Sequence, residues 1–160
     1  MDRINQILYH PLFKIYMEAN AVKEQGRIFC RHNMSHVLDV ARIAYILNME
    51  EEHQVSKDMI YAAALLHDIG RHVQYETGEK HAYVSARLAP EILRDCGFEE
   101  DEIAEIVDAI YHHSDKKEIG DKGLRTLIAK ADRMSRACFA CQASEECKWS
   151  EERKNCEIVW

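Results

Sequence analysis

The segment Ala62–Arg71, with the sequence AAALLHDIGR, is the part of the chain from which the fold can be predicted. Five apolar residues that favour a helix lead directly into His67 and Asp68, and the helix is expected to end at Gly70. An imidazole and a carboxylate buried together are unfavourable unless another group pairs with them, and a metal ion is such a group. We therefore expect other helices to supply further ligands to a metal ion beside His67 and Asp68.

The composition is ordinary for a globular protein, since 47% of the 160 residues are hydrophobic and 31% are charged. The net charge of −7 argues against a protein that binds extended nucleic acid, because such binding depends on basic side chains that neutralise phosphates. A small anionic substrate is compatible with this charge. No apolar run approaches the length of a membrane span, and no signal-peptide pattern is present. We therefore expect a cytoplasmic protein without a membrane partner, in which the six cysteines stay reduced.

Apolar residues recur at intervals of three or four along most of the chain, as they do in amphipathic helices. The expected helical segments are 4–21, divided by a proline at position 11, and then 33–49, 56–70, 80–96, 100–113 and 124–139. Residues 71–78 are expected to form a loop, and Pro90 to kink or divide its helix. No segment alternates as a β-strand does, so we predict an all-α fold, a bundle of about six to seven helices.

Histidines and aspartates occur near the ends or apolar boundaries of five successive predicted helices, and side chains on facing helices can form metal sites. These residues are His36, His67, Asp68, His81, His112, His113 and Asp132. Their order resembles the HD-domain superfamily of metal-dependent phosphohydrolases. The sequences HVLDVA from His36, LLHDIGR around His67 and KAD ending at Asp132 are similar to motifs of that family. The resemblance covers residues 30–134 and implies a helical HD domain.

The resemblance also implies the ligands. In the family the residues that match His36, His67, Asp68 and Asp132 hold one metal ion. His81, His112 and His113 match extra histidines of a subgroup that binds two metal ions, in which Asp68 would bridge them. This subgroup includes cyclic-dinucleotide phosphodiesterases, but their Gly-Tyr-Pro motif is absent here, because Ser-Asp-Lys-Lys follows His113. Mixed nitrogen and oxygen ligands suit Fe, Mn, Co, Ni or Zn better than Mg.

The activity implied by the resemblance is hydrolysis of a phosphoester or phosphoanhydride, expected to be that of a nucleotide, by a metal-bound hydroxide. Besides Asp68, the candidate catalytic residues are Arg71, which could clamp a phosphate, and Lys130, which could orient Asp132 or act as a second cation. His32 could extend the metal cluster or shuttle protons. Two alternatives remain open: a regulatory module that binds metal or nucleotide without turnover, and a di-iron oxygenase on the same scaffold.

We expect a single domain, residues 1–160, composed of N-terminal helices (1–29), the HD core (30–137) and an irregular Cys-rich tail (138–160). The tail cysteines could form a separate site for Zn or an iron–sulfur cluster, since both take four cysteines. They are Cys138, Cys141, Cys147 and Cys156. The alternative is that they are plain reduced thiols. Cys30 and Cys96 are expected to be buried as small hydrophobic residues. The terminal Trp160 suggests docking onto the body of the protein or a homodimer.

Overall fold

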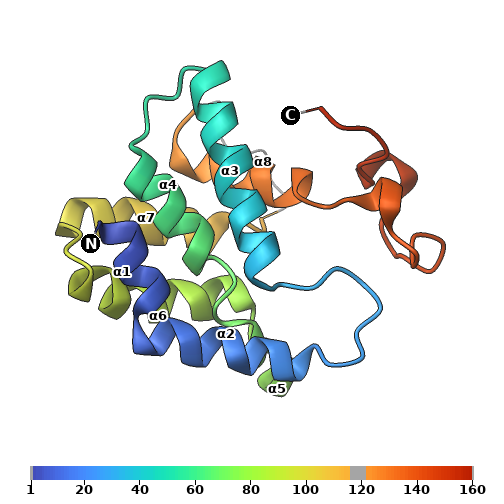
Figure 1. Ribbon diagram of the computed structural model, residues 1–160, viewed down its shortest axis with the longest axis horizontal. Helices are drawn as coiled ribbons and strands as arrows, with labels where there is room; N and C mark the ends of the chain where they lie inside the picture. Colours follow the sequence, from blue (N-terminus) through green and yellow to red (C-terminus); the bar gives the residue numbers. More distant parts are fainter. Residues whose placement is uncertain (1, 116–121, 160) are drawn as a thin grey trace.

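The computed structural model describes residues 2–115 and 122–159, so Trp160 lies outside the described part. In these ranges the chain forms eight α-helices and two short 3-10 helices, and no β-strand (Figure 1). The helices are α1 (Arg3–Tyr9), α2 (Pro11–Lys23), α3 (Met34–Glu50), α4 (Lys57–Leu66), α5 (Arg71–Thr77), α6 (His81–Asp95), α7 (Glu100–His112) and α8 (Leu124–Met134). The predicted all-α fold is confirmed, with more helices than the six to seven expected.

Several helices begin where the sequence provides a capping side chain. Asn33 accepts a hydrogen bond from the backbone N–H of His36 at the start of α3, and Ser56 accepts one from Met59 at the start of α4. Each of these bonds satisfies an N–H group that has no partner within its own helix. Pro11 occupies the first position of α2, where its missing N–H costs nothing.

Two expectations about helix boundaries were wrong, and one of the two alternatives for Pro90 is excluded. Residues 71–77 form α5 instead of a loop, and none of its side chains is buried, so it lacks the apolar pattern that would have indicated a helix. Pro90 does not divide α6, whose buried face continues on both sides of it through Ala89 and Ile92. The helix at 124–139 ends earlier, at Met134, and is followed by a 3-10 turn at Cys138–Ala140.

The helices surround one hydrophobic core. Helix α3 packs against α4 and α8, and α7 packs against α6 and α8. The N-terminal helices belong to the same body, because α1 packs on α4 and α2 packs on α5. Arg3 of α1 also joins two other helices, with Nε 2.9 Å from Asp58 in α4 and one guanidinium nitrogen 3.0 Å from Glu102 in α7.

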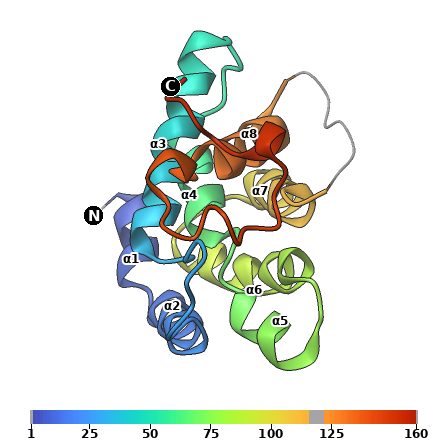
Figure 2. The ribbon, with the colours of Figure 1, turned by 90° about the vertical axis from the view of Figure 1, so that its right-hand side faces the viewer.

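The segment after α8 and the loop between α2 and α3 lie on the same side of the molecule (Figures 1 and 2). Over its described residues, 135–159, the helical structure of this segment is limited to two short 3-10 helices, Cys138–Ala140 and Glu151–Arg153. Among the described residues, no helix combines the length and the apolar character that crossing a membrane requires.

Candidate metal centre

The turn between α4 and α5, residues 67–70, carries two of the predicted ligands into the interior. The apolar residues that precede it in α4 are fully buried. His67 and Asp68 are accordingly 0% and 1% exposed. The N–H of Gly70 donates to Ser85 Oγ of α6 at 2.9 Å, so the end of the turn is fixed against a neighbouring helix.

The carboxylate of Asp68 lies between two pairs of imidazole rings. Its Oδ2 lies 3.2 Å from Nε2 of His67 and 3.5 Å from Nε2 of His36. Its Oδ1 lies 3.2 Å from Nε2 of His81 and 3.7 Å from Nε2 of His113. Because these histidines come from α3, the α4–α5 turn, the start of α6 and the end of α7, four distant segments of the chain meet at one carboxylate.

Asp132 of α8 joins the first pair. Its Oδ1 lies 3.3 Å from Nε2 of His36 and 3.8 Å from Nε2 of His67. The groups whose ligand atoms all lie within 4.8 Å of one another are His36–His67–Asp68, His67–His113–Asp132 and Asp68–His81–His113. The structure therefore brings together the complete set expected for the first metal ion and two of the three histidines expected for the second.

Hydrogen bonds on Nδ1 determine which nitrogen of each ring is free. Nδ1 of His67 lies 2.7 Å from the carbonyl oxygen of Ala64, and Nδ1 of His113 lies 2.6 Å from that of Ile110. A carbonyl oxygen only accepts, so Nδ1 carries the proton in both rings. In the neutral ring, Nε2, which faces Asp68, then has the lone pair that metal ligation requires.

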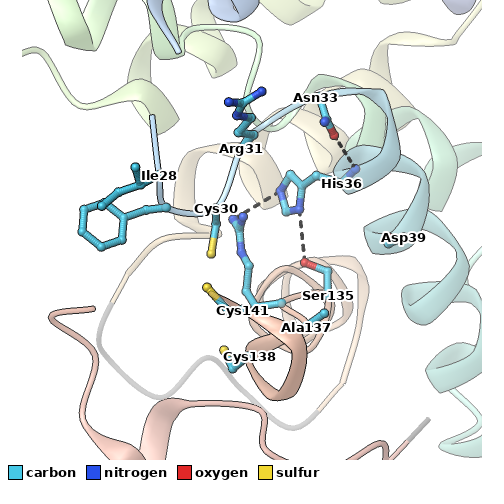
Figure 3. Close-up of a pocket in the computed structure, with 12 residues that line it drawn as sticks. Ile28, Cys30, Arg31, Asn33, His36, Asp39, Ser135, Ala137, Cys138 and Cys141 are labelled. Atoms are coloured by element: carbon cyan, nitrogen blue, oxygen red, sulfur yellow. Dashed lines mark hydrogen bonds between the residues drawn. The ribbon is translucent and has the colours of Figure 1, made fainter. Parts of the chain in front are cut away.

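The other two rings follow the same pattern. Nδ1 of His36 lies 3.2 Å from Ser135 Oγ, whose own hydrogen is donated to the carbonyl of Asp132 at 2.7 Å, so the hydroxyl accepts from the ring (Figure 3). Nδ1 of His81 lies 2.5 Å from the side-chain oxygen of Gln74. In all four imidazoles a contact on Nδ1 therefore fixes the ring so that Nε2 points into the cluster.

The donor groups in the interior of this cluster could hold a metal cation. Oδ2 of Asp68 is buried and, within the described part of the chain, has no hydrogen-bond partner. Imidazole lone pairs and a carboxylate that face one another repel, and a divalent ion that accepts nitrogen and oxygen donors removes the repulsion. The residues present thus fit a divalent metal ion, with Asp68 facing both pairs of rings.

The pKa values of His67, His81 and Asp68 reflect the negative charge of the carboxylates and the burial of the cluster. Burial alone would lower the pKa of His67, but the charges of Asp68 and Asp132 outweigh it and raise this pKa to about 10. Burial lowers the pKa of His81 to about 3. Burial opposes ionisation of Asp68 as well, but Arg71 and His67 hold its pKa well below its ordinary value. A proton on His67 and a metal ion therefore compete for the same negative charge.

Two of the predicted candidates lie outside the cluster. Lys130 does not reach Asp132, because its Nζ donates to Glu51 at 2.9 Å near the surface. His112 is partly exposed, and its Nδ1 lies 2.6 Å from Asp115. Successive positions of a helix point about 100° apart, so at the end of α7 only one of two adjacent histidines can face inward. The structure directs the second of them to the site.

Arg71 does lie at the site, with Nε 3.0 Å from Oδ1 of Asp68. A second arginine, Arg136, was not anticipated. It is buried, and a guanidinium nitrogen lies 3.0 Å from Asp132 and 3.3 Å from Nε2 of His36. Arg136 follows the end of α8, and its position four residues after Asp132 was the available signal.

Helix α2 supplies polar contacts that were also missed. The buried Asn20 donates through Nδ2 to the carbonyl of Asp68 at 2.9 Å and accepts from the N–H of His72 at 2.7 Å. Glu24 contacts Nδ1 of His32, whose Nε2 lies 3.9 Å from Oδ2 of Asp68. His32 therefore lies beside the cluster, and burial lowers its pKa to about 4.

The six cysteines differ in burial. Cys96 is buried, as expected, at 2% exposure. Cys30 is only half-buried and lines the same pocket as Cys138 and Cys141. Of the other predicted tail ligands, Cys147 is half-buried and Cys156 is exposed.

Comparisons with known proteins identify the family. Residues 33–137 match the model of the HD domain, and the chain belongs to this family. A protein of Clostridium beijerinckii described only as uncharacterized is 41% identical over 160 residues, the full length of both chains. Ribonuclease Y of Rubrobacter xylanophilus is 31% identical over 137 residues, which cover 82% of this chain but only 24% of the ribonuclease.

A solved structure has the same fold. It is described as a predicted HD superfamily hydrolase from an uncultured Thermotogales bacterium, with a TM-score of 0.64 and 25% identity, covering 90% of this chain and 79% of the other. The family match, this structure and the buried His/Asp cluster together support a metal-dependent hydrolase.

Proposed function

We propose that this protein is a metal-dependent phosphohydrolase that cleaves a phosphoester or phosphoanhydride bond of a nucleotide. The observation that carries the proposal is the position of Asp68, whose two carboxylate oxygens each face a separate pair of imidazole Nε2 atoms. A carboxylate shared by two sets of ligands is suited to a two-metal site, and such sites are common in enzymes that hydrolyse phosphate esters.

Divalent ions in this site would supply Lewis-acid activation of a water molecule and of a phosphoryl oxygen. The contribution of the chain is to hold the ligands in place before substrate binds. The Nδ1 contacts fix the imidazole rings, and Arg71 holds Oδ1 of Asp68 from the side. Because Asp68 is almost wholly buried, no solvent competes for its oxygens from behind.

The expected substrate is small and anionic. A pocket beside His36 is lined by Arg31 and Arg136, and a guanidinium group can donate two parallel hydrogen bonds to a phosphate (Figure 3). Similarity to ribonuclease Y supports a nucleotide phosphodiester, while the net charge of −7 favours a short nucleotide over a long RNA.

The test is hydrolysis by purified protein supplied with Mn²⁺, Fe²⁺, Co²⁺ or Ni²⁺. The substrates are bis-p-nitrophenyl phosphate, nucleoside phosphates, dinucleoside polyphosphates and a short oligoribonucleotide. We expect turnover that is lost in His67→Ala and Asp68→Asn and retained in His112→Ala, whose ring points away from the cluster. Metal binding without turnover across this panel would contradict the proposal and favour a regulatory module. Oxygen consumption with reduced iron would instead indicate an oxygenase.

A further inference from the structure

Three cysteines from distant parts of the chain line one pocket. Cys30 lies in the loop between α2 and α3, and Cys138 and Cys141 follow α8. Figure 3 shows the sulfur atoms of Cys30 and Cys141 directed toward one another, with Cys138 beside them. Cys138 and Cys141 are separated by two residues, a spacing at which both thiolates can bind one zinc ion.

A fourth cysteine, Cys147, follows Cys141 after two successive turns. The N–H of Ser144 donates to the carbonyl oxygen of Cys141 at 3.3 Å, and the N–H of Cys147 donates to that of Ser144 at 3.4 Å, so the chain folds back after Cys141. Four neighbouring thiols cannot all ionise unless a cation neutralises them, and Zn²⁺ bound by four thiolates does so. Cys156 is the exposed member of the tail cysteines, which makes it the weaker candidate for a ligand.

The tail has little else to stabilise its shape. In residues 137–159 only Ala143 is buried, so almost no apolar surface is removed from water there. Its described contacts are mainly polar, such as the Asn155 side chain donating to the carbonyl oxygens of Arg133 and Arg136 at 2.6 and 2.9 Å. A segment of this length without a core is commonly held by a disulfide or a structural metal ion.

We propose that Cys30, Cys138, Cys141 and Cys147 bind one structural zinc ion, separate from the His/Asp cluster. Such a site would tie the α2–α3 loop to the segment after α8. Arg31 and Arg136 lie one and two residues from its ligands and line the same pocket as His36. The zinc ion would thereby hold the two guanidinium-bearing walls of this pocket together, whatever substrate the protein acts on.

The test is the metal content of the full chain, purified without chelators, by inductively coupled plasma mass spectrometry. Relative to the unmodified protein, we expect Cys30→Ser and Cys141→Ser to lose one equivalent of zinc and Cys156→Ser to lose none. Asp68→Asn, which alters the His/Asp cluster, should keep this equivalent. Loss of zinc in Cys156→Ser with retention in Cys30→Ser would overturn the assignment of the ligands, and iron with acid-labile sulfide would overturn zinc.

Two measurements make the test independent of how well the variants fold. Cobalt-substituted protein should show thiolate-to-cobalt charge-transfer absorption, which nitrogen and oxygen ligands do not produce, and Asp68→Asn should show it as well. Titration of Cys156→Ser, which lacks the exposed thiol outside the proposed site, with a mercurial should release one zinc ion as about four thiols react, the number in a four-cysteine site. Absence of the absorption band, or of zinc release on thiol modification, would refute the site.

Discussion

Gly70 is the residue at which a single added methyl group tests both the fold and the site. A Cβ atom at this position would lie 2.6 Å from Cβ of Val84 and 2.7 Å from the backbone nitrogen of Ser85. Carbon atoms in contact are normally about 3.5–4.0 Å apart, so the overlap is roughly 1 Å. Both obstructing atoms belong to the first turns of α6 and cannot move by rotation of a side chain. In Gly70→Ala the turn or the helix must therefore shift.

The expected cost follows from this geometry. Overpacking of a core costs about 1–3 kcal/mol, and because the obstructing atoms are fixed to the backbone we expect a value near the upper end, about 3 kcal/mol. For a protein of this size each kcal/mol lowers the melting temperature by about 2–4 °C, so Gly70→Ala should melt about 6–12 °C below the unmodified protein. Because Asp68 lies two residues earlier in the turn, the rise in melting temperature on adding Mn²⁺ should also shrink.

The measurement is differential scanning calorimetry with and without Mn²⁺. Gly78→Ala is the matched control, because Gly78 ends α5 with φ of +81° and open space around it. That variant should lose about 1–2 kcal/mol from its left-handed backbone but keep the full response to Mn²⁺. A melting temperature for Gly70→Ala within about 2 °C of the unmodified protein, less than 1 kcal/mol on the same scale, would refute the reasoning.

Three further results are expected. Asn20→Ala should destabilise the protein by about 1–3 kcal/mol in urea denaturation for each buried partner that it leaves unpaired. Mn²⁺ at a hundred times its dissociation constant should stabilise the protein by about 2.7 kcal/mol, and Asp68→Asn should abolish this. A hydrogen bond from Arg3 lowers the pKa of Glu102, so this carboxylate stabilises the fold above its ordinary pKa of 4.5 and loses that effect as the pH falls. Glu102→Gln should therefore cost less than about 1 kcal/mol at pH 7 and almost nothing near pH 3.

The ligands expected for the first metal ion could be proposed because their order resembles the HD-domain superfamily, and the apolar helix before His67 and Asp68 pointed to the same place. The choice between His112 and His113 could not be made in this way. It depends on the angle at which α7 ends, and one position along a helix turns a side chain by about 100°. Asn20 was missed because its partner, the carbonyl of Asp68, is far away in the sequence. Arg136 was missed although Asp132 lies only four residues before it; its second contact, with His36, is distant in the sequence.

For the fold, too, some features could be predicted from the sequence and others could not. Helices with a buried apolar face were predicted because periodicity reports burial directly. Helix α5 was missed because it buries none of its side chains, and Gly78, expected to belong to a loop, ends it in the left-handed conformation. Gly70, expected to end a helix, has φ of −87° and is required instead by the close approach of α6. The sequence pattern marked Gly70 as the end of a helix and Gly78 only as part of a loop, and the structure shows what each one does.

Helix α2 contacts residues of the candidate metal centre, although the family match begins only at residue 33. Asn20 binds the backbone of Asp68, and Glu24 contacts the ring of His32 beside the same carboxylate. The side chain of Asp68 is thus surrounded by residues of the family core. Its backbone carbonyl instead accepts a hydrogen bond from Asn20 in α2, which precedes that core. Because the position of the Asp68 carboxylate depends on its own backbone, α2 contributes to the geometry of a cluster to which it supplies none of the grouped candidate ligands.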